Sequence, residues 1–374
     1  MQIPFNKPYL TGKETEYIRE AVASGKISGD GHFTQKCHSF FEQRYGFKKC
    51  LLTTSCTAAL EMAAILLDMQ PGDEVIAPSY TFVSSVNAFV LRGAKIVFAD
   101  SEAHSPNIDA DSLEGLITPR TKALVVVHYA GMACDMDKVM ALAKKYNLFV
   151  VEDAAQAIDS YYKGRPLGSI GHLAAFSFHE TKNIIAGEGG MLVINDERFM
   201  ERAEIIWEKG TNRRAFFRQE VSRYEWLDIG SSFLPSEITA AFLYAQLECL
   251  EQIQTRRKSL WGGYQQAFLQ NQAIQIIQNL PYTIGNAHMF FLLCQSTHTR
   301  EALRQYLLDK GILAISHYLP LHASPYYASR HDGRPLPQAT AYAERLLRLP
   351  IFYDLRYYAH KFICSDTSDF FTSC

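Results

Sequence analysis

The chain has 374 residues, of which 48% are hydrophobic and 20% are charged, and its formal net charge is -2. This is the composition of an ordinary globular protein, long enough for two or three domains. A charge so close to zero gives no electrostatic case for binding nucleic acid or an anionic membrane surface, so we expect neither as a partner.

Targeting and redox signals are missing from the sequence. No apolar run approaches the ~20 residues of a membrane-spanning helix, and the first residues lack the pattern of a signal peptide. The chain has 8 cysteines but no Cys-x-x-Cys pair, which is typical of reduced thiols. We therefore expect a cytoplasmic protein.

The first chemically informative segment follows an apolar strand predicted at 50–53. It places Ser55 and Cys56 among small hydroxyl residues, directly before a helix predicted at 58–68. The first backbone N–H groups of a helix are unpaired and its dipole favours negative charge there, so this arrangement suits an anion. An ordinary serine N-cap explains the same residues, and taken alone it is the commoner case.

Strand-like and helical runs then alternate, which predicts an α/β fold with a mainly parallel sheet and helices on both faces. The expected strands are 74–77, 96–99, 123–127, 148–151 and 173–178. The expected helices are 83–91, 111–117 and 136–146. In such sheets ligands bind beyond the carboxyl ends of the strands. Polar or aromatic side chains follow these runs at Ser55, 78–82, 128–129, Asp153 and Lys182.

Asp153 and Lys182 together indicate pyridoxal phosphate chemistry. A lysine can form a Schiff base with the cofactor, and a carboxylate can keep the pyridine nitrogen protonated so that the ring accepts electrons. A lone aspartate after a strand is often a turn residue, and a lone lysine is usually solvated. Lys182, however, lies between an apolar run and Gly187-Glu188-Gly189-Gly190, where burial would lower its pKa. We therefore predict that both residues are catalytic.

A metal site has less support. His317 and His322 flank Pro320, but no acidic or thiol cluster accompanies them, and 179–183 does not match His-Glu-x-x-His. We expect no metal.

The alternation of strand-like and helical runs ends after residue 195. A polar, aromatic-rich loop is predicted to reach 232, and a long helical pattern over 236–268 is broken only by Gly262-Gly263. Beyond 286, strand, helix and strand patterns suggest a smaller α+β unit. We predict a large α/β domain at 1–235, a linking helix at 236–270 and a small C-terminal α+β domain at 271–374.

Several motifs resemble one family. They are Thr-Ser-Cys-Thr-Ala-Ala-Leu at 54–60, Pro-Ser-Tyr-Thr-Phe-Val at 78–83, Glu-Asp-Ala-Ala-Gln at 152–156, Ser-Phe-His-Glu-Thr-Lys at 177–182, Gly-Glu-Gly-Gly at 187–190 and His-Tyr-Leu-Pro-Leu-His at 317–322. From about residue 3 to 354 the chain resembles the DegT/DnrJ/StrS group of pyridoxal-phosphate sugar aminotransferases, which have the fold-type I architecture of aspartate aminotransferase.

The resemblance implies roles for individual residues. Lys182 would hold the cofactor and move the proton, and Asp153 would pair with the pyridinium nitrogen. Gln156 would bond the phenolic oxygen, while Phe82 and Ala155 would cover the two ring faces. The phosphate would be held by Ser55, Cys56 and Ser177. His317, Tyr318 and His322 would bind the substrate.

The resemblance also implies a substrate. Residues 24–31, 209–213 and 228–232 resemble members that transfer the amino group of L-glutamate to dTDP-4-dehydro-6-deoxy-D-glucose, for enterobacterial common antigen. Small-molecule substrates and a homodimer or larger homo-oligomer are expected, with the loop 213–232 reaching across. In many members an asparagine contacts the neighbouring subunit's phosphate where this chain has the shorter Ser232. The segment after residue 355 does not resemble the family's last amphipathic helix.

Two other hypotheses stay open. Dehydratases on the same fold have a histidine at the position of Lys182, which disfavours that reading. The second hypothesis is a non-catalytic regulator that binds a sugar nucleotide. The presence of Lys182, Asp153 and Gln156 together argues against it, because simple binding does not need these reactive groups.

Overall fold

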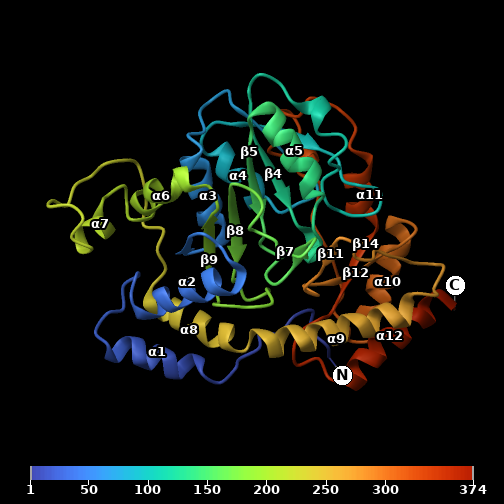
Figure 1. Cartoon of the computed structure of the whole chain (residues 1–374). Coiled ribbons are helices and arrows are strands. Elements are labelled where there is room, and N and C mark those ends of the chain that lie inside the picture. The colour runs from blue at the N-terminus through green and yellow to red at the C-terminus, as the bar shows by residue number, and fades with distance from the viewer. Residues whose placement is uncertain (1, 373–374) are drawn as a thin grey trace.

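The computed structural model describes residues 2–372, and its centre is a seven-stranded sheet (Figure 1). The strands of this sheet are β1 (Cys50–Thr53), β2 (Glu74–Pro78), β3 (Lys95–Ala99), β4 (Thr121–Val127), β5 (Phe149–Asp153), β8 (Leu173–Ser177) and β9 (Gly190–Ile194). Their spatial order is β1-β9-β8-β5-β4-β2-β3. The pairs from β8 to β3 are parallel, whereas β9 is antiparallel to both β8 and β1. The expected α/β fold with a mainly parallel central sheet is confirmed.

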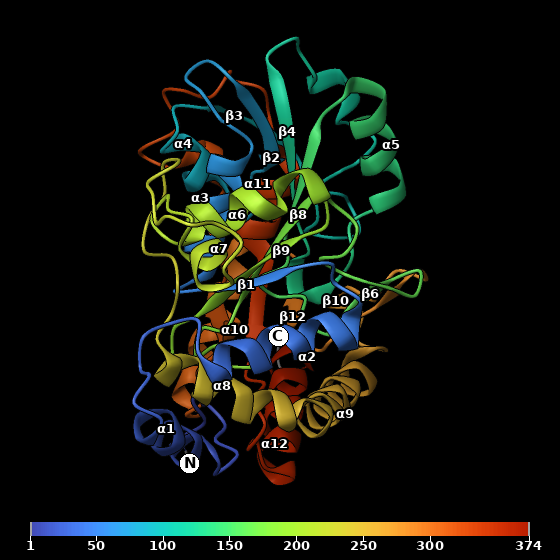
Figure 2. The same ribbon diagram turned by 60° about the vertical axis from the view of Figure 1, so that its left-hand side comes forward.

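Both faces of this sheet are buried under helices, because successive residues of a strand point into different cores. In β2, Val75 and Ala77 join one core and Ile76 joins the other. The first core is covered by α3 (Cys56–Leu66), α4 (Ser84–Val90) and α6 (Met200–Trp207), and the second by α2 (His32–Tyr45), α5 (Met136–Tyr146) and α8 (Glu237–Glu248). Figure 2 shows α4 and α5 on opposite sides of the strands. Outside these, α1 (Glu14–Ala23) packs on α8.

The register of the sheet brings the ends of several strands together. Asp153, the last residue of β5, pairs with Val127, the last residue of β4. Gly190, the first residue of β9, pairs with Ser177 of β8 and with Thr53 of β1. The segments that follow β1, β4, β5 and β8 therefore meet at one edge of the sheet.

A second sheet lies in the C-terminal part of the chain. Its strands, in spatial order, are β10 (Gln275–Ile276), β12 (Phe290–Leu293), β14 (Leu346–Leu349) and β13 (Ile315–Ser316). Around it lie α9 (Leu250–Phe268), α10 (Thr297–Asp309), α11 (Pro337–Arg345) and α12 (Tyr357–Thr372). A third sheet joins distant segments through β11 (Thr283–Ile284), β6 (Tyr161–Tyr162) and β7 (Arg165–Pro166). The predicted domain boundaries at 235 and 270 stay a prediction.

Two expected helices differ from the structure. The pattern over 236–268 forms two helices, α8 and α9, which meet at Cys249, and Gly262-Gly263 lies inside an unbroken α9. The expected helix at 111–117 is only a 3₁₀ turn at Glu114–Leu116. There the Asp109 side chain accepts a bond from Asp111 N–H at 3.1 Å, and such local bonds compete with a helix.

The C-terminal segment forms a helix, α12, although its sequence does not resemble the family's last amphipathic helix. α12 packs beside α9 and α10, and the two views agree on its place next to α9 (Figures 1 and 2). His360 Nε2 lies 2.9 Å from Leu260 O, and the Phe370 ring lies 5.5 Å from that of Tyr306. The pattern was obscured because Thr367, a polar residue, is fully buried in this helix. Residues 373 and 374 lie outside the described part of the chain.

One segment stands away from the body of the molecule. The short helix α7 (Arg213–Phe217) and the loop after it extend from α6 at the left of Figure 1. The remaining elements are 3₁₀ turns at Tyr129–Gly131, Glu197–Phe199 and Leu321–Ala323. Among residues 2–372, no helix combines the length and the apolar character that crossing a bilayer requires.

Candidate active site

Lys182 lies in the loop between β8 and β9, at the edge where the strand ends meet. Its N–H donates to His179 O at 2.9 Å, and the N–H of Ala186 donates to Phe178 O at 2.7 Å, so the loop is held by its own backbone. Burial lowers the pKa of the Lys182 amine because the ammonium form loses hydration, while the nearby Asp153 carboxylate opposes that shift. A lysine with a lowered pKa has more of the neutral amine, which is the nucleophilic form.

Asp153 ends β5 with a buried carboxyl group. Its Oδ2 accepts a hydrogen bond from Ser85 Oγ at 2.6 Å, and its Oδ1 accepts one from Ala155 N–H at 3.1 Å. Burial raises the pKa of Asp153, and these two bonds and the Lys182 charge act against the rise. The structure thus brings the predicted acid and amine into one electrostatic environment.

The neighbouring acid, Glu152, is a structural residue. Its carboxylate lies 2.9 Å from His128 Nε2. It also accepts three backbone N–H bonds, from Gly168, Ile170 and Gly171. His128 Nδ1 in turn accepts from Cys134 N–H at 3.2 Å, so Nε2 carries the ring's proton. Since these donors occupy Glu152, Asp153 is the carboxylate that faces the site.

The start of α3 lies against the start of β9. Ser55 caps this helix, because its Oγ accepts from Ala58 N–H at 3.0 Å. A Cβ placed on Gly190 would lie 2.3 Å from Ser55 C and 2.4 Å from Cys56 N, so only glycine allows this approach. Ser177, which pairs with Gly190, is buried beside them. The predicted phosphate residues are therefore adjacent, and the helix N-terminus there suits an anion.

Gln156 connects the two halves of the site. Its Oε1 accepts from Ala130 N–H at 2.6 Å, and its Nε2 donates to Tyr318 Oη at 3.1 Å. The Phe82 ring is 55% exposed and lies 6.0 Å from the Tyr318 ring. Ala155 is half-buried, between Asp153 and Gln156 in the chain.

His317 and His322 lie close to the segment after β2. His317 Nδ1 is 2.6 Å from Tyr129 Oη, and its carbonyl oxygen accepts from Tyr80 Oη at 2.6 Å. Burial lowers the pKa of His317 strongly, so the ring is neutral. His322 Nδ1 lies 2.6 Å from Ser79 Oγ. Within residues 2–372, no group of three or more His, Cys, Asp or Glu side chains forms a metal site.

Ser232 is not brought to this group. It is exposed in the loop before α8, and its backbone bridges to Glu208. No contact joins it to Lys182 or Asp153 within the described part of this chain, so its cofactor role stays a prediction.

Three further residues of the site, Ser85, Tyr129 and Arg348, were not predicted from the sequence. Ser85 lies inside the expected helix 83–91 and carries no signal of its own. Tyr129 was noted only as following a strand. Arg348 had a usable signal, since it is the one charge in the buried strand Leu-Leu-Arg-Leu at 346–349.

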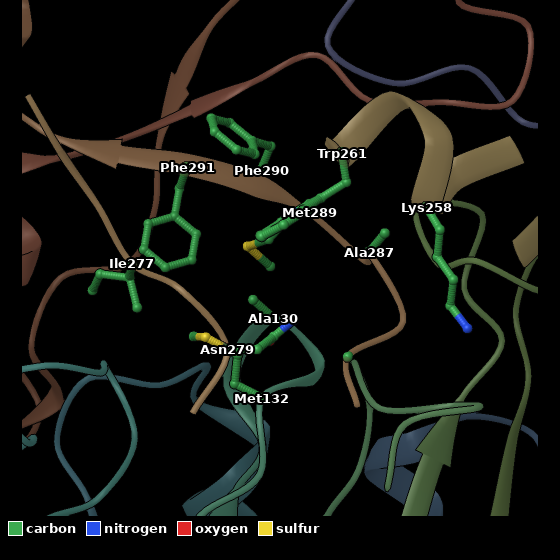
Figure 3. Close-up of a pocket in the computed structure, with 11 residues that line it drawn as sticks. Ala130, Met132, Lys258, Trp261, Ile277, Asn279, Ala287, Met289, Phe290 and Phe291 are labelled. Carbon is green, nitrogen blue, oxygen red and sulfur yellow. The ribbon is translucent and has the colours of Figure 1, made fainter. Parts of the chain in front are cut away.

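A cavity of about 140 Å³ is lined in part by Ala130, whose N–H is bonded to Gln156. Figure 3 shows mostly apolar side chains around it, among them Trp261, Met289 and Phe291, together with the polar Asn279 and with Lys258 at its margin. Lys258 Nζ lies 3.7 Å from Asp159 Oδ2. The cavity therefore lacks a free reactive group, and the chemistry belongs to the Lys182 site.

The chain is similar to proteins of one aminotransferase family. The sequence profile of the DegT/DnrJ/EryC1/StrS aminotransferase family matches residues 8–366. The chain is 33% identical over 371 residues to the GDP-perosamine synthase of Escherichia coli O157:H7, covering 99% of each chain. It is 36% identical over 361 residues to the spore coat polysaccharide biosynthesis protein SpsC of Bacillus subtilis (strain 168), covering 94% of this chain and 92% of SpsC. Among solved structures, the PLP-form of Spr1654 from Streptococcus pneumoniae superposes with a TM-score of 0.91 at 27% identity, covering 100% of this chain and 99% of that one.

Proposed function

The chain belongs to the DegT/DnrJ/EryC1/StrS aminotransferase family, and on that premise we propose that it aminates a nucleotide-linked 4-keto-6-deoxy sugar. It is a sugar aminotransferase that uses pyridoxal phosphate. Pyridoxal phosphate chemistry is supported by the buried Lys182 amine, whose pKa is lowered, and by the buried Asp153 carboxyl, whose charge acts on it. A nucleotide-linked sugar is supported by the 33% identity to a GDP-perosamine synthase.

The residues of the site fit the cofactor in charge and in hydrogen bonding. Lys182 Nζ would hold it covalently, and Asp153 would hold the protonated ring nitrogen through a charge-assisted hydrogen bond. Ser55, the N–H of Cys56 and Ser177 would hold the phosphate, because the first turn of α3 offers unpaired N–H groups. When bound, pyridoxal phosphate supplies an electron sink that stabilises negative charge on the substrate carbon attached to nitrogen.

Other residues would orient the ring and move the proton. Gln156 would bond the phenolic oxygen, and Phe82 and Ala155 would cover the two ring faces. The Lys182 amine, once released, would carry the proton between the substrate carbon and the cofactor, since its pKa is lowered toward the working range of a general base.

The sugar would lie on the side of the second sheet, near Tyr318, His317 and His322. The full proposal is that L-glutamate and dTDP-4-dehydro-6-deoxy-D-glucose give 2-oxoglutarate and dTDP-4-amino-4,6-dideoxy-D-galactose, in the cytoplasm, for enterobacterial common antigen or a related surface polysaccharide. The relatives found carry the names of a GDP-sugar synthase and a spore coat polysaccharide protein. The nucleotide is therefore the part of the proposal that an experiment must decide first.

A homodimer, or a larger homo-oligomer, is part of the same proposal. The loop from Arg213 to Ser232 exposes large apolar side chains, with Trp226 80% and Phe217 69% accessible. Apolar groups grouped on one projecting segment favour a second subunit as their cover. Ser232 would then act across the interface, and a fully active monomer in sedimentation would refute this.

The direct test is the visible absorption of the purified protein with pyridoxal phosphate, before and after L-glutamate. The band of the lysine-linked cofactor is expected to bleach with glutamate and to return with the correct keto-sugar. Matched dTDP-, GDP- and UDP-linked 4-keto-6-deoxy sugars then identify the nucleotide. A protein that binds these sugars but never bleaches would instead support a non-catalytic regulator, and turnover with a GDP-sugar alone would support an aminotransferase on another keto-sugar nucleotide.

A further inference from the structure

Arg348 is placed on the inner face of the second sheet by the pairing of β14. It lies opposite Phe291 of β12 and Ile315 of β13. Its neighbours Leu347 and Leu349 point into the core of the second sheet. Because side chains alternate along a strand, Arg348 points the other way, toward the site. The Phe291 ring on that face lies 5.6 Å from the ring of Tyr129.

The guanidinium of Arg348 has no anionic partner. The residue is only 9% exposed, and its Nε is enclosed without a hydrogen bond. No ion pair or hydrogen bond of its side chain is formed within residues 2–372. The Phe5 ring covers it at 4.5 Å, a cation–π contact that leaves the N–H groups of the fork unused.

A second buried arginine, Arg257, differs from Arg348 because its guanidinium has hydrogen-bond acceptors. Arg257 is 4% exposed, and its guanidinium donates to the carbonyl oxygens of Ala287 and His288. Arg348 has no such acceptors. A buried cation without a partner destabilises the protein. A bound anion would pair with Arg348 and remove this cost.

The Asp153 carboxylate acts electrostatically on Lys182 and Tyr318, but it is not among the groups that act on Arg348. The hydroxyls of Tyr80, Tyr129 and Tyr318 interact with its charge, and Arg348 in turn contributes to the lowered pKa of Lys182. With Arg348 and Arg257 as cations and Asp153 as the carboxylate, the site has an excess of positive charge within electrostatic reach of the Lys182 amine. An anion is the ligand that this balance requires.

We propose that Arg348 binds the α-carboxylate of the amino-acid donor through its planar guanidinium. This rests on the proposed function, because it assigns a group of that reaction's second substrate to a residue. An amino acid carries its carboxylate on the same carbon as the reacting nitrogen, so the anion must lie close to Lys182. A guanidinium matches a carboxylate with two parallel N–H···O bonds.

The other anionic source is the diphosphate of the sugar nucleotide. It is attached to the first carbon of the sugar, across the ring from the keto carbon that reacts at Lys182. The diphosphate must therefore lie farther from the amine than a donor's carboxylate. The buried position of Arg348, whose charge acts on Lys182, favours the carboxylate.

The test compares Arg348→Met with Arg345→Met in the enzyme loaded with pyridoxal phosphate. Arg345 is a matched control, since it is nearby in the chain, half-buried and bonded to the backbone oxygen of Cys294. The glutamate concentration that half-bleaches the cofactor band is expected to rise on the order of 100-fold in Arg348→Met, because a buried charge pair is lost. It should stay unchanged in the control. Arg348→Lys should recover part of the loss.

Binding without turnover supplies a second readout. Calorimetric titration with glutarate, a dicarboxylate without an amine, should show weaker binding in Arg348→Met, while dTDP binding and the cofactor band stay as in the unmodified chain. Unchanged glutamate dependence in a folded Arg348→Met would overturn the proposal. So would a loss confined to dTDP, which would assign Arg348 to the diphosphate. If Arg348→Met does not fold, an Arg348→Lys enzyme with normal glutamate and glutarate affinity overturns it equally. Failure of the proposed function looks different, because the unmodified chain itself would then not bleach with any amino acid.

Discussion

Ser85 donates its hydroxyl hydrogen to Asp153 Oδ2 across 2.6 Å, from a helix that follows a strand two places away in the sheet. Thr81 Oγ1 lies 2.8 Å from the same Ser85 oxygen. The Asp153 carboxylate is thus supported by side chains from another βα unit. This support favours its ionised form, which burial alone would disfavour.

Replacing Ser85 with alanine should therefore weaken cofactor binding. Hydrogen bonds to charged groups contribute roughly 1.5–3 kcal/mol, so the dissociation constant of pyridoxal phosphate is expected to rise about 10- to 100-fold. Ser84→Ala is the matched control, because Ser84 Oγ lies 2.8 Å from Thr57 Oγ1, not from Asp153. Equal cofactor affinities in the two variants, measured by absorbance titration, would contradict this role for Ser85.

Replacing Lys182 with methionine should abolish steady amino transfer without destabilising the protein freed of cofactor. The loss of a general base alone is about 10²- to 10⁴-fold in rate, and the loss of covalent attachment adds to it. The fold should tolerate the change, because burial already disfavours the charged amine that methionine removes. Thermal unfolding of both cofactor-free proteins checks the second part, and a much lower melting temperature in Lys182→Met would disprove it.

Gly190→Ala should damage the start of α3. The added Cβ would meet the backbone of Ser55 and Cys56 at 2.3 and 2.4 Å, so the helix end must move. We expect a loss of about 1–3 kcal/mol in the free energy of unfolding, and weaker binding of phosphate-bearing ligands. Gly262→Ala is the control, since no atom lies within 4 Å of its Cβ and alanine favours a helix interior. Chemical unfolding of the two variants should give shifts of opposite sign.

The free energy of unfolding should decrease as the pH falls below about 6.5, the usual pKa of histidine. Burial lowers the pKa of His38 to about 3, and it lowers the pKa of His288 and His317 as well. Between those values and about 6.5 the unfolded chain binds protons that the folded chain does not, so each histidine removes roughly 1 kcal/mol per pH unit on acidification. Glu102 acts oppositely, because burial raises its pKa to about 7, but it offsets only one of them.

Chemical unfolding at pH 7.5 and 5.5 measures this dependence. A His38→Gln variant, which keeps an acceptor for Leu52 N–H, should show a smaller change between the two pH values. Equal free energies of unfolding for the unmodified protein at both pH values would show that the histidines do not act this way.

The large sheet and the Lys182–Asp153 pair were predictable because they depend on local patterns. Continuous apolar runs predict buried parallel strands, and residues after such strands meet at one edge. Ser85 was not predictable as a site residue, because its contact with Asp153 depends on the order of the strands in the sheet. Arg348 is marked in the sequence as the one charge in an apolar strand, but the direction in which it points depends on the register of β14, which no short pattern encodes. The helix α12 was missed for a related reason. Its buried Thr367 breaks the apolar spacing that a surface helix normally shows.

The site is closed by contacts between segments very far apart in the chain. Tyr80 Oη and His317 O are bonded across 237 positions, and Leu321 N–H donates to Ser79 O at 2.9 Å. On the ribosome, the segments with Lys182 and Asp153 emerge long before His317 and Arg348. Contacts at such sequence separation form late and slowly. A growing chain therefore contains Lys182 before it contains the C-terminal residues that face it. The chain can bind substrate only after the second sheet has been synthesised and has packed against the first.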